Sequence, residues 1–361
     1  MYNLLHPYLS DLAIAGIGAA LSFIVTYIID VLFIKGRLTG LPVDHGKVVT
    51  REDGTQISIN AESNNKVTSI GTVFFVYFIL FSLLFTPISY EYAAYVAVAI
   101  FTMVIGYLDD AVFGAKKGLE GKELAKYEKK MEYLNGVLEL VGAFIPALMF
   151  ALWNDTDIHI FRLTVHVPFA VYILLAMLLI WVSVNAVNGT DGVDGLSGTV
   201  YLINIATYLI IFHEELGDYT LRGLILQATV LAYLFHNFGE SRILMGDAGS
   251  RPLGFFLALF AMKSGHPISF LLISSVFIFD GFLGVVKLAI LRIYEKLFGH
   301  EKKEALRKKG LFKIAFPFHV HLKTNCGWEK KKVVCFFIIL SLFVAVLSVF
   351  IFWLFMSDTL L

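Results

Sequence analysis

Residues 333–357 read VVCFFIILSLFVAVLSVFIFWLFMS, a run of apolar side chains that contains no charged residue. An α-helix needs about 20 predominantly apolar residues to cross the hydrocarbon core of a bilayer, so this run predicts a spanning helix. The whole chain has the same character: its 361 residues are 58% hydrophobic and only 16% charged. Soluble domains average about 25% charged residues. The sequence therefore predicts an all-α integral membrane protein rather than a large soluble core.

Similar apolar segments recur along the chain and predict about ten spans. They are 12–34, 69–87, 92–108, 136–153, 167–186, 198–213, 220–237, 252–266, 268–291 and 333–357. The ninth contains Asp280, Gly281 and Gly284, so we expect it to be bent or broken. The first lacks a clear cleavage site, and we interpret it as a retained span. We expect a single membrane domain over residues 1–361, because no soluble domain or long linker stands out.

Lys and Arg side chains gather in alternate loops, with five in 35–68, six in 109–135 and twelve in 292–332. Basic residues collect on the cytoplasmic side of membrane proteins. This pattern predicts extracytoplasmic termini and five cytoplasmic segments. The formal net charge is +0, which gives no reason to expect a nucleic-acid partner. Cys326 and Cys335 lie in a basic loop and an apolar run, so we expect no disulfide framework.

The unusual polar clusters all fall in the predicted cytoplasmic segments, and the first is GYLDD at 106–110. Asp109 and Asp110 repel each other at a helix C-terminus, where the helix dipole also disfavours acids. A divalent metal or a role in proton transfer would resolve the conflict. The alternative is a solvated acidic helix end, balanced by Lys116 and Lys117.

The second cluster is NAVNGTDGVDGLSG at 185–198. Asn185 and Asn188 share one face of a helix end, and Asp191 and Asp194 follow in a glycine-rich loop whose backbone can approach a ligand closely. The alternative is an ordinary turn, with Ser197 as the cap of the next helix.

Two further clusters are Asn237 with LMGDAGS at 244–250, and FPFHVH at 316–321. Asp247 lies beside an expected helix start at Ser250–Pro252, which suits a cation or phosphate site; the alternative is a turn aspartate. His319 and His321 would share a face of an extended segment, as a metal pair, a phosphate-binding pair or a surface accident.

Together these clusters favour phosphoryl transfer with Mg²⁺, which binds through one or two carboxylates and substrate phosphates. An ion-coupled transporter is the competing interpretation. Transporters, however, place charges near the bilayer midplane, whereas these acids lie at span ends. The few mid-span charges, at Asp30, Glu139 and Lys287, have no obvious partners.

In the order and spacing of these motifs, the chain resembles the phospho-N-acetylmuramoyl-pentapeptide-transferases, within the polyprenyl-phosphate N-acetylhexosamine-1-phosphate transferase superfamily. The resemblance rests on GYLDD, NAVNGTDGVDGLSG, LMGDAGS and HVH, with Trp328 and the basic KKKVV at 330–334, and it runs from the first span to the tenth. It implies transfer of phospho-N-acetylmuramoyl-pentapeptide from UDP to undecaprenyl phosphate, with UMP released and Mg²⁺ as cofactor. It also implies a homodimer in the bacterial cytoplasmic membrane, with its active site on the cytoplasmic face. A relative that uses UDP-N-acetylglucosamine is the alternative.

The resemblance also implies roles for individual residues. Asp247 matches the magnesium ligand, and Asp109 and Asp110 match the first acidic pair, with Asp109 as candidate base toward the lipid phosphate. His319 is a further catalytic candidate. The implied substrate-binding residues are Lys116, Lys117, Asn185, Asn188, Asp191, Asp194, Asn237, Leu244 and His321.

Several positions depart from the family pattern. Val320 replaces the middle histidine of three, and Leu244 stands where an aromatic residue is usual. Val67-Thr68-Ser69 replaces Thr-Pro-Thr, which leaves Asn64 or Lys66 for the lysine on the uridine side. These departures affect sugar and uracil recognition and leave the acidic residues unchanged.

Overall fold

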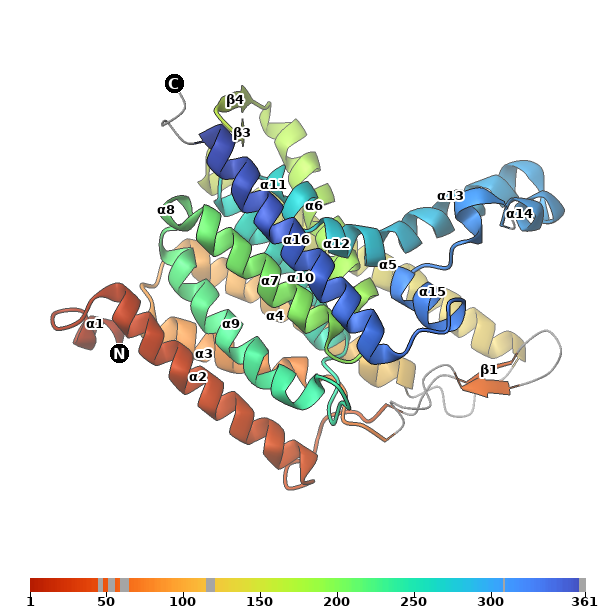
Figure 1. The fold of residues 1–361 in the computed structure, drawn as a ribbon, viewed down its shortest axis with the longest axis horizontal. Helices are drawn as coiled ribbons and strands as arrows, with labels where there is room; N and C mark the ends of the chain where they lie inside the picture. Colours follow the sequence, from red (N-terminus) through yellow and green to blue (C-terminus); the bar gives the residue numbers. More distant parts are fainter. Residues whose placement is uncertain (45–47, 51–55, 59–64, 115–120, 308, 357–361) are drawn as a thin grey trace. The chain divides into compact units, whose positions relative to one another are not determined.

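The computed structural model describes residues 1–361 except 45–47, 51–55, 59–64, 115–120, 308 and 357–361. Helices make up most of its regular structure (Figure 1). Within the described residues the strands form two short antiparallel hairpins, β1–β2 (Val48–Thr50, Gln56–Ser58) and β3–β4 (Asp157–Ile160, Leu163–His166). The predicted all-α class is therefore confirmed.

Each predicted span coincides with helical structure. The helices are α2 (Asp11–Ile34), α3 (Gly71–Phe85), α4 (Tyr90–Gly114), α5 (Gly121–Trp153), α6 (Phe169–Thr190), α7 (Leu196–Ile211), α9 (Asp218–Asn237), α10 (Asp247–Lys263) and α16 (Lys330–Met356). Within the described residues, five are long and apolar enough to cross a membrane, namely α2, α4, α5, α6 and α16. The membrane character is thus supported, while the number of ten spans and the side of the termini stay predictions.

The ninth predicted span is interrupted, as its Asp and Gly residues indicate. It consists of α11 (Ser269–Ile273), α12 (Ser275–Phe277), a π-helical turn η2 (Ile278–Phe282) and α13 (Leu283–Phe298). Gly281 in η2 packs against α6, where a Cβ atom would collide with the Ala186 carbonyl oxygen. Shorter helices are α1 (Tyr2–Leu5), α8 (His213–Leu216), α14 (His300–Arg307) and α15 (Phe318–Thr324), with a 3₁₀ turn η3 (Gly310–Lys313).

Contacts divide the chain into two compact units. The first comprises 1–146 and 221–252, and in it α2 packs along α3. The second comprises 147–220 and 253–361, and in it α7 packs along α16 and α6 packs against η2. The single domain predicted over 1–361 stays a prediction.

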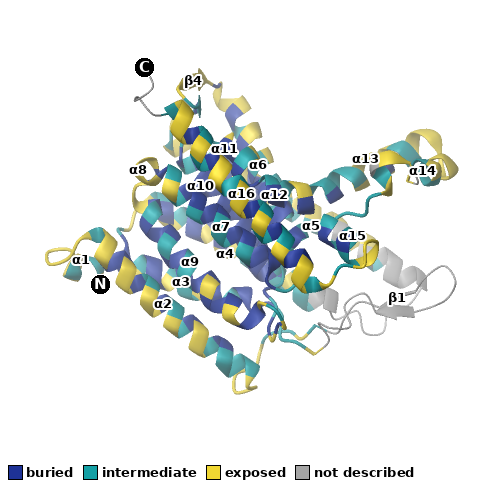
Figure 2. Cartoon of the chain, in the orientation of Figure 1, coloured by how far each residue is buried: buried dark blue, intermediate teal, exposed yellow. Residues whose placement is uncertain are grey.

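The outward faces of the long helices are apolar. Figure 2 shows buried and exposed sides along α2 and α16. The exposed side of α16 carries Ile339, Phe343, Val346 and Phe350, while Val333, Phe337 and Phe352 are buried. An exposed apolar stripe of this length would be unfavourable in water, and a bilayer would cover it.

Candidate active site

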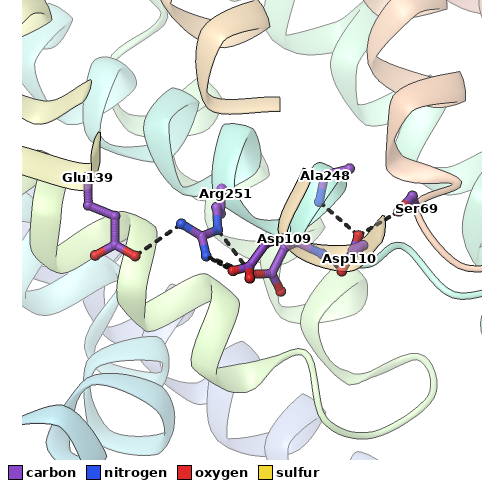
Figure 3. A network of polar contacts seen from close by, with 7 residues as sticks. Ser69, Asp109, Asp110, Glu139, Ala248 and Arg251 are labelled. Atoms are coloured by element: carbon purple, nitrogen blue, oxygen red, sulfur yellow. Dashed lines mark hydrogen bonds and ion pairs between the residues drawn. The ribbon is translucent and has the colours of Figure 1, made fainter. Parts of the chain in front are cut away.

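A cluster of carboxylates surrounds Arg251 in the first unit (Figure 3). The Nη2 atom of Arg251 donates to Oδ2 of Asp109 (2.5 Å) and to Oδ2 of Asp247 (2.8 Å). Its Nη1 atom donates to Oε1 of Glu139 (3.0 Å), and the Arg251 side chain is only 8% exposed. Three helices, α4, α5 and α10, therefore direct carboxylates at one guanidinium group.

Asp109, Glu139, Asp247 and Arg251 form an acidic centre in which the carboxylates outnumber the cation. Arg251 contributes one positive charge, because a guanidinium stays protonated in proteins, against the carboxylates of Asp109, Asp247 and Glu139. The remaining negative charge favours a further cation. Asp109 and Asp247 also direct oxygens at the same nitrogen atom, and oxygens of this kind suit Mg²⁺.

The described residues contain no group of three or more His, Cys, Asp or Glu side chains arranged to hold a metal ion. A site built from these residues would therefore need ligands from elsewhere. Mg²⁺ meets this condition, because it usually binds through one or two carboxylates and completes its shell with waters and substrate phosphates. The donors present fit Mg²⁺ on this basis.

Asp110 has different partners from its neighbour Asp109. Its Oδ2 accepts from Ser69 Oγ (2.6 Å) and from the Ala248 N–H (3.4 Å), and its Oδ1 accepts from the Asp247 N–H (3.2 Å). The first N–H groups of a helix lack intrahelical acceptors, and negative charge is favourable there. Asp110 therefore fixes the start of α10 against α4. The alternative of a freely solvated acidic end is wrong for this carboxylate, while Lys116 and Lys117 lie outside the described residues.

Glycines allow α4 and α10 to come this close. A Cβ atom at Gly106 would collide with the Asp247 and Ala248 backbone, and one at Gly246 with Oδ2 of Asp110. Gly246 also has φ +66°, which favours glycine. The predicted helix start at Ser250–Pro252 is wrong, because this turn starts α10 already at Asp247. Arg251 consequently lies one turn inside the helix, at the i+4 position from Asp247.

The segment before α10 holds Asn237 and Leu244. Asn237 Nδ2 donates to the Ile243 carbonyl (2.9 Å), and the Leu244 N–H donates to the Val67 carbonyl (2.8 Å). Lys66 Nζ donates to Ser241 Oγ (2.7 Å) in the same segment. Of the two candidates for the lysine position, Lys66 thus reaches this loop, whereas Asn64 lies outside the described residues.

The asparagine and aspartate loop lies in the second unit. Asn185 and Asn188 lie in the last turns of α6, which continues to Thr190, and Asn185 Nδ2 donates to the Trp181 carbonyl (2.9 Å). Asp191 caps α6, and Asp194 accepts from Lys330 Nζ (2.9 Å) at the start of α16. Ser197 is not the cap of α7, because that helix is capped by Gly195.

The two histidines do not form the predicted extended pair. They lie on the helix α15, where positions i and i+2 face different directions. His319 is buried and contacts Asp280, with its backbone N–H 2.7 Å from Oδ1 and its Nδ1 2.8 Å from Oδ2. His321 Nδ1 instead accepts from the Ala315 N–H (3.2 Å).

Sequence reasoning missed Ser69, Glu139, Arg251 and Asp280 as site residues. Two charges that we expected to lack partners have them: Glu139 binds Arg251, and Lys287 Nζ donates to the Ile314 carbonyl (2.6 Å). The i, i+4 spacing of Asp247 and Arg251 was a usable signal for an ion pair. The sequence pattern indicated Asp280 only as a residue that interrupts the ninth predicted span.

Comparison with known proteins agrees with these motifs. Residues 92–265 match the family described as Glycosyl transferase family 4. A Microcystis aeruginosa protein is 30% identical over 309 residues, which cover 83% of this chain and 80% of the relative. A Treponema pallidum protein is 27% identical (78% and 76% covered), and a Thermotoga neapolitana protein 28% (77% and 83%). All three are named phospho-N-acetylmuramoyl-pentapeptide-transferase.

The helical membrane fold and these matches define a membrane-embedded glycosyl transferase. More closely, the chain belongs to the phospho-N-acetylmuramoyl-pentapeptide-transferase family. The family match spans GYLDD, the asparagine and aspartate loop and Asp247.

Proposed function

We propose that this chain transfers phospho-N-acetylmuramoyl-pentapeptide from its UDP derivative to undecaprenyl phosphate, releasing UMP, in a reaction that requires Mg²⁺. The names of its relatives support the reaction. The observation that carries the acidic chemistry is the convergence of Asp109 and Asp247 oxygens on one cationic atom. Phosphoryl transfer depends mainly on positioning and on charge neutralisation, and such a centre supplies both.

Four residues in and beside the acidic centre have distinct tasks in this proposal. Asp247 would hold Mg²⁺, which when bound neutralises charge on the donor diphosphate. Asp109 acts as the base toward the lipid phosphate, and Arg251 keeps the Asp109 and Asp247 carboxylates in place. Asp110 anchors the start of α10 through two backbone N–H groups. These tasks describe a direct displacement, in which an oxygen of the lipid phosphate bonds to the sugar-bearing phosphorus as UMP leaves; a covalent path would instead need one of these carboxylates as the nucleophile.

The remaining family positions are assigned to the substrate. Asn185, Asn188, Asp191 and Asp194 bind the uridine and diphosphate in this proposal. Further substrate contacts are assigned to Asn237, Leu244, His321, Lys116 and Lys117, and His319 is assigned to catalysis. The active site faces the cytoplasm, and the protein is a homodimer, which light scattering in detergent would test.

One assay tests the function. Purified protein in detergent receives undecaprenyl phosphate, Mg²⁺ and either UDP-N-acetylmuramoyl-pentapeptide or UDP-N-acetylglucosamine, and UMP release is followed. We expect UMP only from the first donor. Release from the second donor alone would assign the chain to the alternative sugar, and release from neither would reject the transferase function.

The role of Asp247 is tested in the same assay. We expect Asp247→Asn to abolish turnover while the protein still purifies as a folded species, because an amide is a poorer Mg²⁺ ligand than a carboxylate. The matched control is Glu214→Gln, which changes a carboxylate that is 87% exposed at α8 and should keep full activity. Full activity in Asp247→Asn would mean that the metal is held elsewhere.

A further inference from the structure

Asp280, which forms a buried pair with His319, has no role in the proposed function so far. Both side chains are almost completely buried, with exposures of 0% and 2%. Asp280 lies in the π-helical turn η2, and His319 lies in the first turn of α15, so the pair joins two elements of the second unit.

The hydrogen bonds define which nitrogen of His319 carries a proton. One Asp280 oxygen accepts from the His319 backbone N–H, and the other is 2.8 Å from Nδ1. A carboxylate oxygen accepts hydrogen bonds, so we assign Nδ1 as the donor. In the neutral ring Nε2 then has a lone pair to offer, and the backbone bond holds the Asp280 carboxylate beside His319.

The other end of the ring faces the asparagine and aspartate loop. A Cβ atom added at Gly192 would collide with Nε2 of His319 and lie 2.9 Å from its Cε1, which is too close for either contact. Gly192 itself is exposed, so the Nε2 edge of the ring lies next to backbone that a ligand can reach. A side chain at position 192 would cover this edge, which gives a physical reason for glycine there.

We infer that Asp280 is a positioning residue that fixes His319 as its Nδ1–H form and thereby presents Nε2 to the diphosphate of the donor at Gly192. This inference rests on the proposed function, because it assigns the diphosphate to this loop. Asp280 itself does not touch the substrate. A carboxylate that orients a histidine through Nδ1 is a general way to set which ring nitrogen reacts.

Other charged groups near His319 come from several elements. Asp191 and Asp194 flank Gly192 in the loop, and Lys330 at the start of α16 binds Asp194. His321 lies on α15 itself and receives the Ala315 N–H. Among the described residues, the Asp280 side chain is the one that hydrogen-bonds to the His319 ring. Substitution of Asp280 therefore changes the hydrogen bonding of the His319 ring most directly.

The first test needs no activity and no variant of Asp280. Protein labelled with ¹⁵N-histidine is examined by NMR, and the His319 signals are assigned from their loss in His319→Gln. We expect chemical shifts of a ring protonated at Nδ1. A ring protonated at Nε2 alone would overturn the inference, whatever the assay for UMP shows.

The second test uses Asp280→Asn, whose amide can donate to Nδ1 and so favours the opposite tautomer. We expect kcat to fall on the order of 10²-fold, the scale of a lost acid–base partner. The ring signals of His319 should move from the Nδ1–H pattern to the Nε2–H pattern in this variant, because the amide donates to Nδ1. A purely structural tie would lower stability and leave the ring signals of His319 unchanged.

Asp157→Asn is the matched control, because it removes a second aspartate–histidine pair. Asp157 accepts from His166 at 2.6 Å on the β3–β4 hairpin, where the histidine side chain is 85% exposed. Neither the His319 signals nor kcat should change in this variant. If the NMR result holds but UMP is never released, the proposed function fails while the positioning of His319 stands.

Discussion

At the scale of single residues, Arg251 is the centre of the first unit's polar network. It lies in the second turn of α10 and holds carboxylates from α4, α5 and its own helix. A buried ion pair contributes little relative to apolar residues, but removal of one partner leaves an uncompensated charge and is strongly destabilising. Here the removal of one cation would leave three acids facing each other.

We therefore expect Arg251→Gln to lower the unfolding temperature in metal-free buffer. Breaking a buried pair costs about 3–5 kcal/mol, and the lower end applies because Asp247 is 30% exposed. Added Mg²⁺ should bring the unfolding temperature of Arg251→Gln closer to that of the unaltered protein, because a metal ion can replace part of the missing positive charge. Thermal unfolding in detergent at increasing Mg²⁺ concentration measures both effects.

Arg37→Gln is the control for this measurement, since Arg37 is exposed after the end of α2. Its loss should change neither the unfolding temperature nor the response to Mg²⁺. Equal stability of Arg251→Gln and the unaltered protein in metal-free buffer would show that the acidic centre needs no internal cation.

At the scale of elements, close helix contacts depend on glycines at defined positions. Gly106 on α4 faces the backbone of Asp247 and Ala248 at the start of α10. Backbone atoms cannot turn aside as the end of a long side chain can. The separation of α4 and α10 is therefore set by the absence of a side chain at position 106, and the hydrogen bonds of Asp110 depend on it.

Gly106→Ala should consequently reduce both stability and UMP release. An extra methyl group in a packed contact costs about 1–3 kcal/mol, and any shift of α10 moves Asp247 away from Asp109. Gly136→Ala is the matched control, because a Cβ atom at Gly136 on α5 would meet no other atom within 4 Å. That variant should be neutral or more stable by about 0.5–1 kcal/mol, as expected for replacing glycine in a helix. Equal stability and equal UMP release in Gly106→Ala and Gly136→Ala would contradict the close contact between α4 and α10.

The sequence predicted the positions of the helices better than their ends. Apolar runs locate a span because bilayer thickness sets its length, but polar residues can continue the same helix beyond it. Thus α4 extends to Gly114 rather than 108, and α10 begins at Asp247 rather than 252.

The site was predictable where chemistry is local and unpredictable where it depends on distant residues. Asp109 and Asp247 meet as expected. The spacing of Asp247 and Arg251 signals one local ion pair. The contacts of Arg251 with Glu139 and Asp109, however, span 112 and 142 positions, and no local pattern predicts them. Asp280 was missed for the same reason, since His319 lies 39 positions further on. That these two clusters serve one pocket stays a prediction.

At the scale of the whole molecule, the orientation in the membrane is the property that the charge pattern predicts most directly. Loop 292–332 carries twelve Lys and Arg residues and should lie in the cytoplasm. It contains Cys326, which is free and exposed. The second cysteine, Cys335, is also exposed but lies on α16, within a predicted span, where lipid would cover it.

Cys326 should therefore react with a membrane-impermeant maleimide in inverted vesicles and stay unlabelled in spheroplasts, both tested in a Cys335→Ser background. Glu214→Cys in a background of Cys326→Ser and Cys335→Ser is the opposite control. Position 214 lies on α8, between the sixth and seventh predicted spans, and should react in spheroplasts alone. Mass spectrometry of the labelled protein reads out both positions. Labelling of Cys326 in spheroplasts would show that the orientation is the reverse of the predicted one. The basic loops, with GYLDD and the loop 187–198, would then lie outside the cell. UDP-linked donors made in the cytoplasm would not reach them there.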